Sequence, residues 1–223
     1  MFYFKINRIK ICDNKENPQF LFFGRDVAQV KLISFIATEN TELPDVSEFL
    51  LCNDAVQKKA LLGKAIESVI AARIFTEIDN VKDNHIMTFG STGFVLYKSE
   101  KIPDDIDWQF IAYESDQNIS DNAQMVDDIV NDSEFGKFTD NFTSLLSRVP
   151  NPSLTAAVAI AKFAVNVITK VAKQNHDDLI GILYTSLNRR QHYPYGERRR
   201  DRVPDLTNNM FIDYSLFGYD ENK

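Results

Sequence analysis

The chain has 223 residues, of which 44% are hydrophobic and 26% are charged, and its 32 acidic and 25 basic side chains give a net charge of −7. A chain of this length and composition can bury its own core, which excludes disordered, collagen-like and disulfide-scaffold proteins. Its acidic surface opposes non-specific binding, so bulk nucleic acid is not expected as a partner.

The N-terminal part alternates between apolar and polar residues, which is the period of a β-strand. Strands are predicted at residues 2–12, 19–23 and 27–37. A polar turn at 13–18 and a short Gly-Arg-Asp turn separate them. Because the links are short, we expect a three-stranded antiparallel meander.

The middle of the chain mixes one helix with further strands. A helix is predicted over 53–66, capped by Asn53 or Asp54, with Val56, Ala60 and Gly63 on one face. Strands follow at 70–78, 85–89, 94–98 and 106–114. The Gly90–Gly93 stretch between two of them predicts a hairpin turn.

The period then changes to that of helices. Amphipathic helices are predicted from Ser120, over 135–146, and from Ser153 or Thr155 to Gln174. The last is the most apolar stretch, but Lys162 and Lys170 interrupt it, and a central Lys costs ~2.5–3.5 kcal/mol in a spanning helix. We therefore expect no transmembrane segment, and a helix that is buried or docks a partner.

The C-terminal part returns to β structure. Strands are predicted at 179–187 and 210–217, with a long loop over 188–206 between them. Strands on both sides of the helices predict one domain over 1–223. This is a mainly β fold, an antiparallel β-sandwich formed by 1–116 and 178–218, with an α-helical insertion at 120–176.

Acidic residues recur in the predicted loops. Alternate loops of an antiparallel sandwich lie at the same end, so several of these residues could converge there. Calcium takes six to eight oxygen ligands from such flexible loops. Asp is also a favoured turn residue, so the same pattern fits ordinary turns. The candidate calcium ligands are Asp13, Glu16, Asp116, Asp177 and Asp178.

A sandwich of about eight strands with Asp-bearing loops resembles the calcium- and phospholipid-binding domains of the synaptotagmin and protein kinase C type. The resemblance covers 1–116 and 178–218 and rests on strand number and loop composition. It implies calcium-assisted contact with a membrane surface. The chain has no stretch matching the Ser-Asp-Pro-Tyr loop of those domains, so no functional residue is carried over.

The segment from Arg189 to Arg202 is the most distinctive part of the sequence. It holds six of the ten arginines and carries a net charge of +4, which leaves −11 for the rest of the chain. Guanidinium groups bind phosphate or carboxylate bidentately, and tyrosines can support them by stacking. The alternative is a solvated loop paired with the chain's own carboxylates. The candidate anion- or partner-binding residues are Arg189, Arg190, Tyr193, Tyr195, Arg198, Arg199, Arg200 and Arg202.

These features predict a non-enzymatic binding module for an anionic ligand or an acidic protein partner. The alternative is a hydrolase with dispersed acid and histidine groups, using His176 or His192, although the chain has no Gly-x-Ser-x-Gly elbow and no phosphate loop. The N-terminus lacks the apolar core of a signal peptide, and Cys12 and Cys52 form no metal spacing, so we expect a cytoplasmic protein.

Overall fold

A computed structural model gives the fold and describes residues 1–15, 27–41, 43, 46–114, 122–174, 178–193 and 196–219. The chain divides into two compact units. The first consists of Met1–Ile36, Ile74–Asp116 and Ala172–Lys223, and the second consists of Ala37–Arg73 and Gln117–Val171. The first unit holds the β-sheets and the second is helical.

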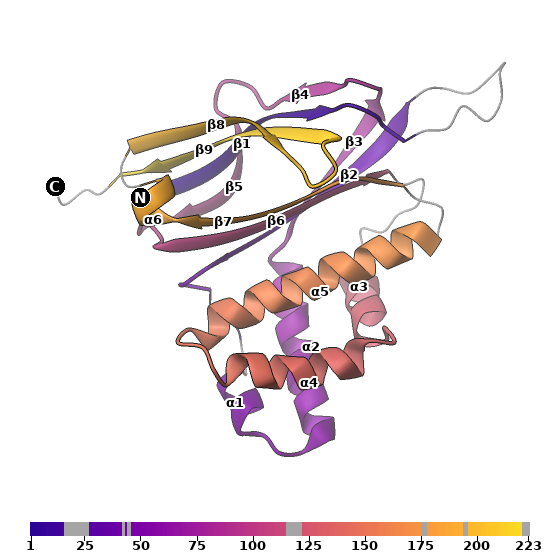
Figure 1. The fold of residues 1–223 in the computed structure, drawn as a ribbon, viewed down its shortest axis with the longest axis vertical. Helices are drawn as coiled ribbons and strands as arrows, with labels where there is room; N and C mark the ends of the chain where they lie inside the picture. The colour runs from indigo at the N-terminus through magenta and orange to yellow at the C-terminus, as the bar shows by residue number, and fades with distance from the viewer. Residues whose placement is uncertain are drawn as a thin grey trace. The chain divides into compact units, whose positions relative to one another are not determined.

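Two antiparallel sheets form the first unit, which confirms the predicted β-sandwich (Figure 1). In the five-stranded sheet the order is β4 (Ile86–Thr88), β1 (Phe2–Ile11), β9 (Met210–Gly218) and β8 (Gly196–Pro204), and β5 (Phe94–Ser99) also pairs with β1. In the four-stranded sheet the order is β3 (Ile74–Val81), β2 (Ala28–Thr38), β6 (Asp105–Glu114) and β7 (Leu179–Asn188).

The inward side chains of both sheets form one apolar core. At its centre the Phe4 and Trp108 rings meet edge to face at 4.8 Å, and Tyr214 lies 5.5 Å from each of them. The indole of Trp108 donates a hydrogen bond of 2.9 Å to the Ser34 hydroxyl, so its polar atom is satisfied inside the core. These contacts join β1 and β9 of one sheet to β2 and β6 of the other.

The predicted N-terminal meander is wrong for the two strands that the structure describes. β1 and β2 lie in different sheets. Both edges of β1 are occupied by strands from later in the chain, β4 and β5 on one side and β9 on the other. Alternation identified the strands, but it carries no information about their partners. The predicted strand at 19–23 lies outside the described residues.

The Gly90–Gly93 segment is not a hairpin turn. β4 and β5 both run antiparallel to β1, along the same edge, at Arg8–Lys10 and at Phe2–Ile6 respectively. The chain therefore runs in the same direction before and after this segment, instead of reversing as it would in a hairpin. Both glycines have positive φ, +68° at Gly90 and +71° at Gly93. Gly93 lies directly against β1, because an added Cβ would come within 2.9 Å of the Asn7 Oδ1 atom.

The predicted loop over 188–206 is also wrong. Its residues form the short helix α6 (Arg189–His192) and the exposed edge strand β8, which pairs with β9. Pro, Gly and clustered charge suggested a loop. An edge strand can carry charged side chains on both faces, so it shows no apolar alternation.

The second unit contains α1 (Val46–Leu51), α2 (Ala55–Ala71), α3 (Asn122–Val130), α4 (Phe135–Leu146) and part of α5 (Pro152–Gln174). Thus the segment Ala37–Arg73 joins the later helices. Asp54 caps α2 by accepting a 2.7 Å hydrogen bond from the Gln57 N–H. The predicted apolar face of α2 is wrong, because Val56 is exposed and the buried face carries Leu62, Ile66 and Ile70.

Helix α5 begins at Pro152, not at Ser153 or Thr155 as predicted, because the Asn151 side chain accepts a hydrogen bond from the Leu154 N–H and Pro suits the first helical position. Its Phe163 ring stacks on Phe138 of α4 at 4.2 Å. By length and composition alone α5 is the one described helix that could cross a membrane, and half of that apolar window is buried in the structure.

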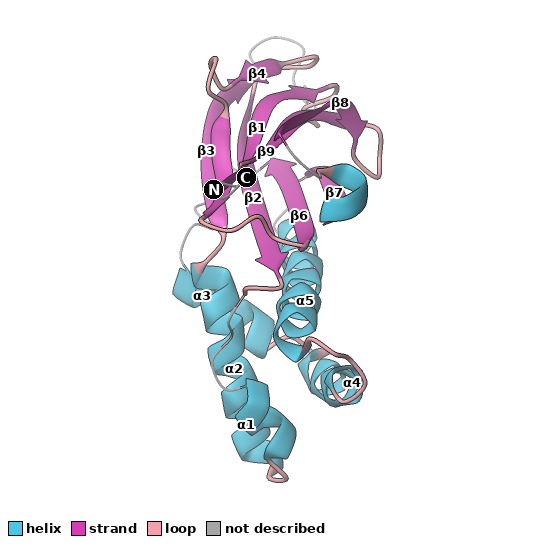
Figure 2. Cartoon of the chain, turned by 90° about the vertical axis from the view of Figure 1, so that its left-hand side faces the viewer, coloured by secondary structure: helices cyan, strands magenta, loops and turns pink. Residues whose placement is uncertain are grey.

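One buried carboxylate fastens the end of the sandwich. Asp205, in the turn between β8 and β9, is 4% exposed. Its Oδ1 atom accepts from the backbone N–H groups of Asn209 and Met210, and its Oδ2 atom accepts from Thr207 and from the Ile182 N–H of β7. A side chain in the turn between two strands of one sheet thereby satisfies a backbone group of the other sheet. The strands of both sheets are drawn in magenta in Figure 2.

Replacing Asp205 by Ala should lower the free energy of unfolding by about 2–4 kcal/mol, because several buried donors lose their acceptor. Chemical denaturation of the purified chain measures this. The matched control is Asp178→Ala, whose exposed carboxylate makes no hydrogen bond with the described residues and which should change stability by less than about 0.5 kcal/mol. Equal stability of both variants would show that Asp205 does not hold the turn.

Gly90→Ala and Gly93→Ala separate backbone strain from steric contact. Both positions have positive φ, but an added Cβ meets nothing at Gly90 and crowds Asn7 and Ile6 at Gly93. We expect a loss of about 1 kcal/mol for Gly90→Ala and about 2–4 kcal/mol for Gly93→Ala. The same denaturation measurement applies. Similar losses for the two variants would contradict the close approach of Gly93 to β1.

Candidate functional site

The outer face of the five-stranded sheet is defined by the alternation along β1. Phe2, Phe4 and Ile6 are buried in the core, whereas Tyr3 and Lys5 between them are partly exposed. The same alternation continues on β9, where the core residues Ile212, Tyr214 and Leu216 alternate with outward residues. The outward side chains of neighbouring strands therefore stand side by side.

The strand register arranges these outward side chains in four rows across the sheet. Each row carries at least one Lys or Arg, and aromatic rings stand in the two end rows. In order along β1, the rows are Lys98–Tyr3–Phe217–Glu197, Val95–Lys5–Ser215–Arg199, Thr88–Arg8–Asp213 and Ile86–Lys10–Phe211–Pro204. We call this surface, with Arg202 at its edge, the basic face.

Asp213 lies at the centre of the basic face and orders it. Its carboxylate is 3% exposed, with Oδ2 2.8 Å from the Arg8 Nε atom of β1 and Oδ1 accepting a 2.7 Å hydrogen bond from the Arg202 N–H of β8. Both neighbouring strands bulge beside it, between Ile6 and Arg8 and between Arg200 and Val203. Arg202 has φ +55° within the second bulge. Asp213 therefore fixes the register of three strands.

Cations of the basic face lie over its aromatic rings. The Lys98 Nζ atom is 5.7 Å from the centre of the Tyr3 ring, and the Arg202 Cζ atom is 6.0 Å from the centre of the Phe211 ring. Phe217, which pairs with Tyr3, is 37% exposed. Each end of the face thus combines a positive charge with an aromatic surface.

The basic face has more positive than negative groups. Its basic residues are Lys5, Arg8, Lys10, Lys98, Arg199 and Arg202, and its acidic residues are Glu197, Asp201 and Asp213. Asp213 is already bound, and Asp201 accepts a 2.7 Å hydrogen bond from Arg199, which raises the pKa of that guanidinium. Among the described residues, neither Lys5 nor Lys10 has a carboxylate partner.

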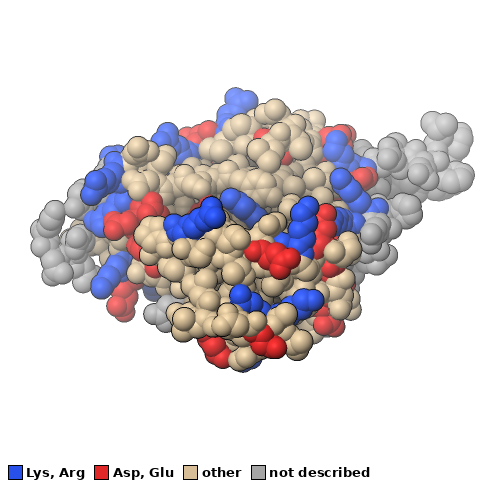
Figure 3. All heavy atoms as spheres, turned by 60° about the horizontal axis from the view of Figure 1, so that its bottom comes forward, with Lys and Arg blue, Asp and Glu red and all other residues tan. Residues whose placement is uncertain are grey.

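One face of the molecule carries side chains of both charges. On the face of the molecule drawn in Figure 3, Lys and Arg side chains are interspersed with Asp and Glu side chains. Such mixed charge is typical of an ordinary solvated surface. The excess of positive charge on the basic face is the more unusual arrangement in a chain with a net charge of −7.

The predicted arginines do not all lie on one surface. Arg199 and Arg202 belong to the basic face. Arg198 and Arg200 point to the other side of β8, opposite Leu216 and Tyr214, and are exposed. Burial raises the pKa of the Tyr214 phenol, and the nearby Arg200 opposes that shift.

The remaining predicted residues lie apart from the basic face. Arg189 and Arg190 are on α6, where the Arg189 Nη1 atom is 3.7 Å from Asp104 Oδ1. Tyr193 is a core residue, 1% exposed and packed on Phe2 at 5.4 Å, so it does not offer a ring to a ligand. Tyr195 lies outside the described residues.

The candidate calcium ligands are not gathered in the described part of the chain. Asp13 accepts from the Lys15 ammonium at 2.7 Å and from the Lys15 N–H at 2.8 Å, and these bonds lower its pKa. Asp178 is exposed. Glu16, Asp116 and Asp177 lie outside the described residues. Within the described ranges, no group of three or more His, Cys, Asp or Glu side chains could hold a metal ion.

Of the two histidines named for hydrolase chemistry, the structure describes His192. The His192 Nδ1 atom accepts a 2.8 Å hydrogen bond from the Asn188 N–H, a local contact at the start of α6. His176 lies outside the described residues. Within the described part of the chain, the His192 ring makes hydrogen-bond contacts with Asn188 and with no serine or carboxylate.

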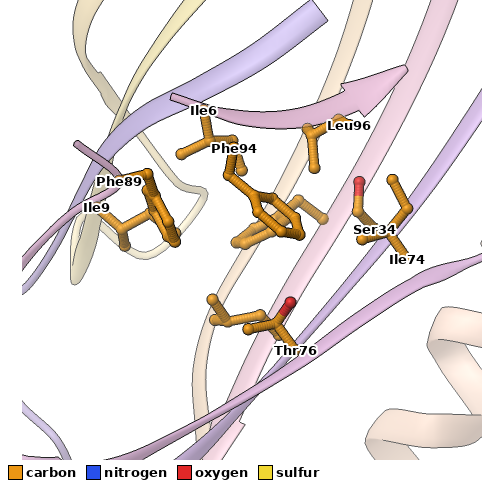
Figure 4. Close-up of a pocket in the computed structure, with 10 residues that line it drawn as sticks. Ile6, Ile9, Ser34, Ile74, Thr76, Phe89, Phe94 and Leu96 are labelled. Carbon is orange, nitrogen blue, oxygen red and sulfur yellow. The ribbon is translucent and has the colours of Figure 1, made fainter. Parts of the chain in front are cut away.

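A cavity between the two sheets is apolar and small. Figure 4 shows its lining, in which Ile6, Phe94 and Leu96 surround a space with the hydroxyl groups of Ser34 and Thr76 at its wall. It has room for about one water molecule. Since Ser34 already accepts from Trp108, this cavity is a packing defect of the core and not a substrate site.

The contribution of β1 and β5 to the basic face was not predicted from the sequence. Strict alternation would place Lys5 on one side of the strand and Arg8 and Lys10 on the other. The bulge between Ile6 and Arg8, which the sequence pattern does not reveal, brings all three cations to the outer side. Lys98 had no local signal either, because its place depends on pairing with Tyr3. Recognition of the basic face required the strand order.

No protein-family model matches the chain, and no curated protein matches it in sequence. The function must therefore be argued from the residues of the chain itself.

Replacing Arg198, Arg199 and Arg200 together by Ala should leave the melting temperature within about 2 °C of the wild-type value, because exposed charges contribute little to stability. The three side chains are exposed, and among the described residues only Arg199 of the three has a carboxylate partner. Thermal unfolding followed by circular dichroism measures this. A large loss of stability would mean that these arginines hold the fold together and are not available to a ligand.

Proposed function

We propose that the chain is a non-enzymatic binding module that holds an anionic ligand on its basic face. The observation that carries this proposal is the register of β5, β1, β9 and β8, which places a Lys or Arg in each of four adjacent rows. Lys5 and Lys10 have no internal carboxylate partner among the described residues, so their charges are available to a ligand.

Binding would proceed by charge pairing over a preorganised surface. The Asp213 contacts to Arg8 and Arg202 hold β1 and β8 in place, so little order has to be created when a ligand arrives. Arg202 and Arg199 can hold phosphate or carboxylate groups with two parallel hydrogen bonds, whereas Lys5 and Lys10 act as point charges.

The strand β8 connects this proposal with the arginine-rich segment. Its outward arginines extend the basic face, and Arg198 and Arg200 add positive charge along the exposed edge of the sheet. A ligand longer than the face could therefore continue around that edge. Charged side chains on an edge strand also prevent sheet-to-sheet aggregation, and this role needs no ligand.

Two further expectations belong to the same proposal. A cytoplasmic location suits Cys12 and Cys52, which are free and partly exposed, since thiols stay reduced there. Calcium-assisted binding stays a prediction that rests on residues mostly outside the described ranges. Anion binding by the basic face needs no metal.

The test uses inorganic polyphosphate, a polyanion without bases or apolar groups. Isothermal titration of the wild-type chain should show binding whose affinity falls as salt rises. The double variant Lys5→Gln/Lys10→Gln should bind about tenfold more weakly at low salt, and its salt slope should fall by about 2.

The matched control is Lys59→Gln/Lys137→Gln, which makes the same change in net charge at exposed positions of α2 and α4. It should bind like the wild type. If both double variants weaken binding equally, the ligand responds to overall charge and the basic face is not its site. Absence of polyphosphate binding by the wild type would contradict the proposal itself.

A further inference from the structure

We infer that the ligand of the basic face is a single-stranded nucleic acid. This inference rests on the proposed function and specifies the anion that is bound. Charge alone would suit any polyanion. The aromatic residues of the face are the feature that selects among them, because a base can stack on a ring whereas a plain phosphate chain cannot.

The rings are spaced along the face. Tyr3 and Phe217 are register partners on β1 and β9 in the first row, and Phe211 stands in the last row, six residues from Phe217 on the same strand. At the usual rise of a β-strand this separation is about 20 Å. A strand of several nucleotides could therefore place a base at each end and its phosphates over the rows between.

The cations stand where the phosphates of such a strand would lie. Lys5 and Arg199 flank Ser215 in the second row, and Arg8 occupies the third. Between the aromatic rows the face therefore carries charge and no ring. Lys98 now lies over the Tyr3 ring and Arg202 over the Phe211 ring. A base could also bind beneath one of these cations, in the position that the ring occupies now.

The same surface does not suit a duplex. Stacking on a flat sheet requires unpaired bases, since the rings cannot reach the base faces inside a helix. The acidic remainder of the chain repels a large uniformly charged rod, and this was the reason against bulk nucleic acid. A short single strand meets only the local positive charge.

The experiment is fluorescence anisotropy with a labelled twelve-nucleotide oligo(U), at fixed low salt. The full chain should bind it, and a labelled RNA duplex of the same length should bind at least about tenfold more weakly. Phe217→Leu and Phe211→Leu keep an apolar strand residue but remove the ring. Each should weaken oligo(U) binding about fivefold or more, because stacking is lost.

The polyphosphate titration separates failure of this inference from failure of the proposed function. Both ring variants should bind polyphosphate like the wild type and keep its melting temperature. The nucleic-acid inference is overturned, and the anion-binding function stands, if two results are found together. The wild type binds oligo(U) no more tightly than polyphosphate, and Phe217→Leu does not change the affinity for oligo(U). Tighter binding to vesicles of anionic phospholipid than to oligo(U) would also overturn it. If the wild type bound neither polyphosphate nor oligo(U), both proposals would be overturned.

Discussion

The register of the five-stranded sheet around Asp213 is the constraint on which the functional surface depends. One buried carboxylate takes the Arg8 side chain from β1 and the Arg202 N–H from β8, and both strands bulge beside it. A shift of one residue in either strand would turn its outward cations toward the core. The rows of the basic face therefore exist because Asp213 fixes which side chains face out.

The rest of the first unit makes that surface stiff. The aromatic contacts of Phe4, Trp108 and Tyr214 pack the two sheets together, and Asp205 joins the β8–β9 turn to β7 through backbone hydrogen bonds. A binding surface on paired strands with such support keeps its geometry without a ligand. In this account the core and the Asp205 turn act on function indirectly, by holding β8 and β9 beside β1.

Local patterns in the sequence predicted most strands and helices. They failed to predict strand pairing, which depends on residues far apart in the chain. Alternation located β1 and β2 but not their separate sheets, and the Gly90–Gly93 signal predicted a hairpin where β4 and β5 share one edge of β1. The sequence of β8 predicts a loop because an exposed edge strand shows no apolar period. Arginine clustering identified part of the candidate site. Lys98 depends on pairing that no local pattern contains.

The most direct test of the account is a two-dimensional amide NMR titration of the ¹⁵N-labelled chain with polyphosphate. Peak shifts report which residues the ligand approaches, whatever its affinity. We expect the largest shifts on β1, β9 and β8, at Lys5, Arg8 and Lys10 and at their partners on β9. Shifts concentrated on helices of the second unit, or spread evenly over all exposed lysines, would contradict the basic face as the binding site.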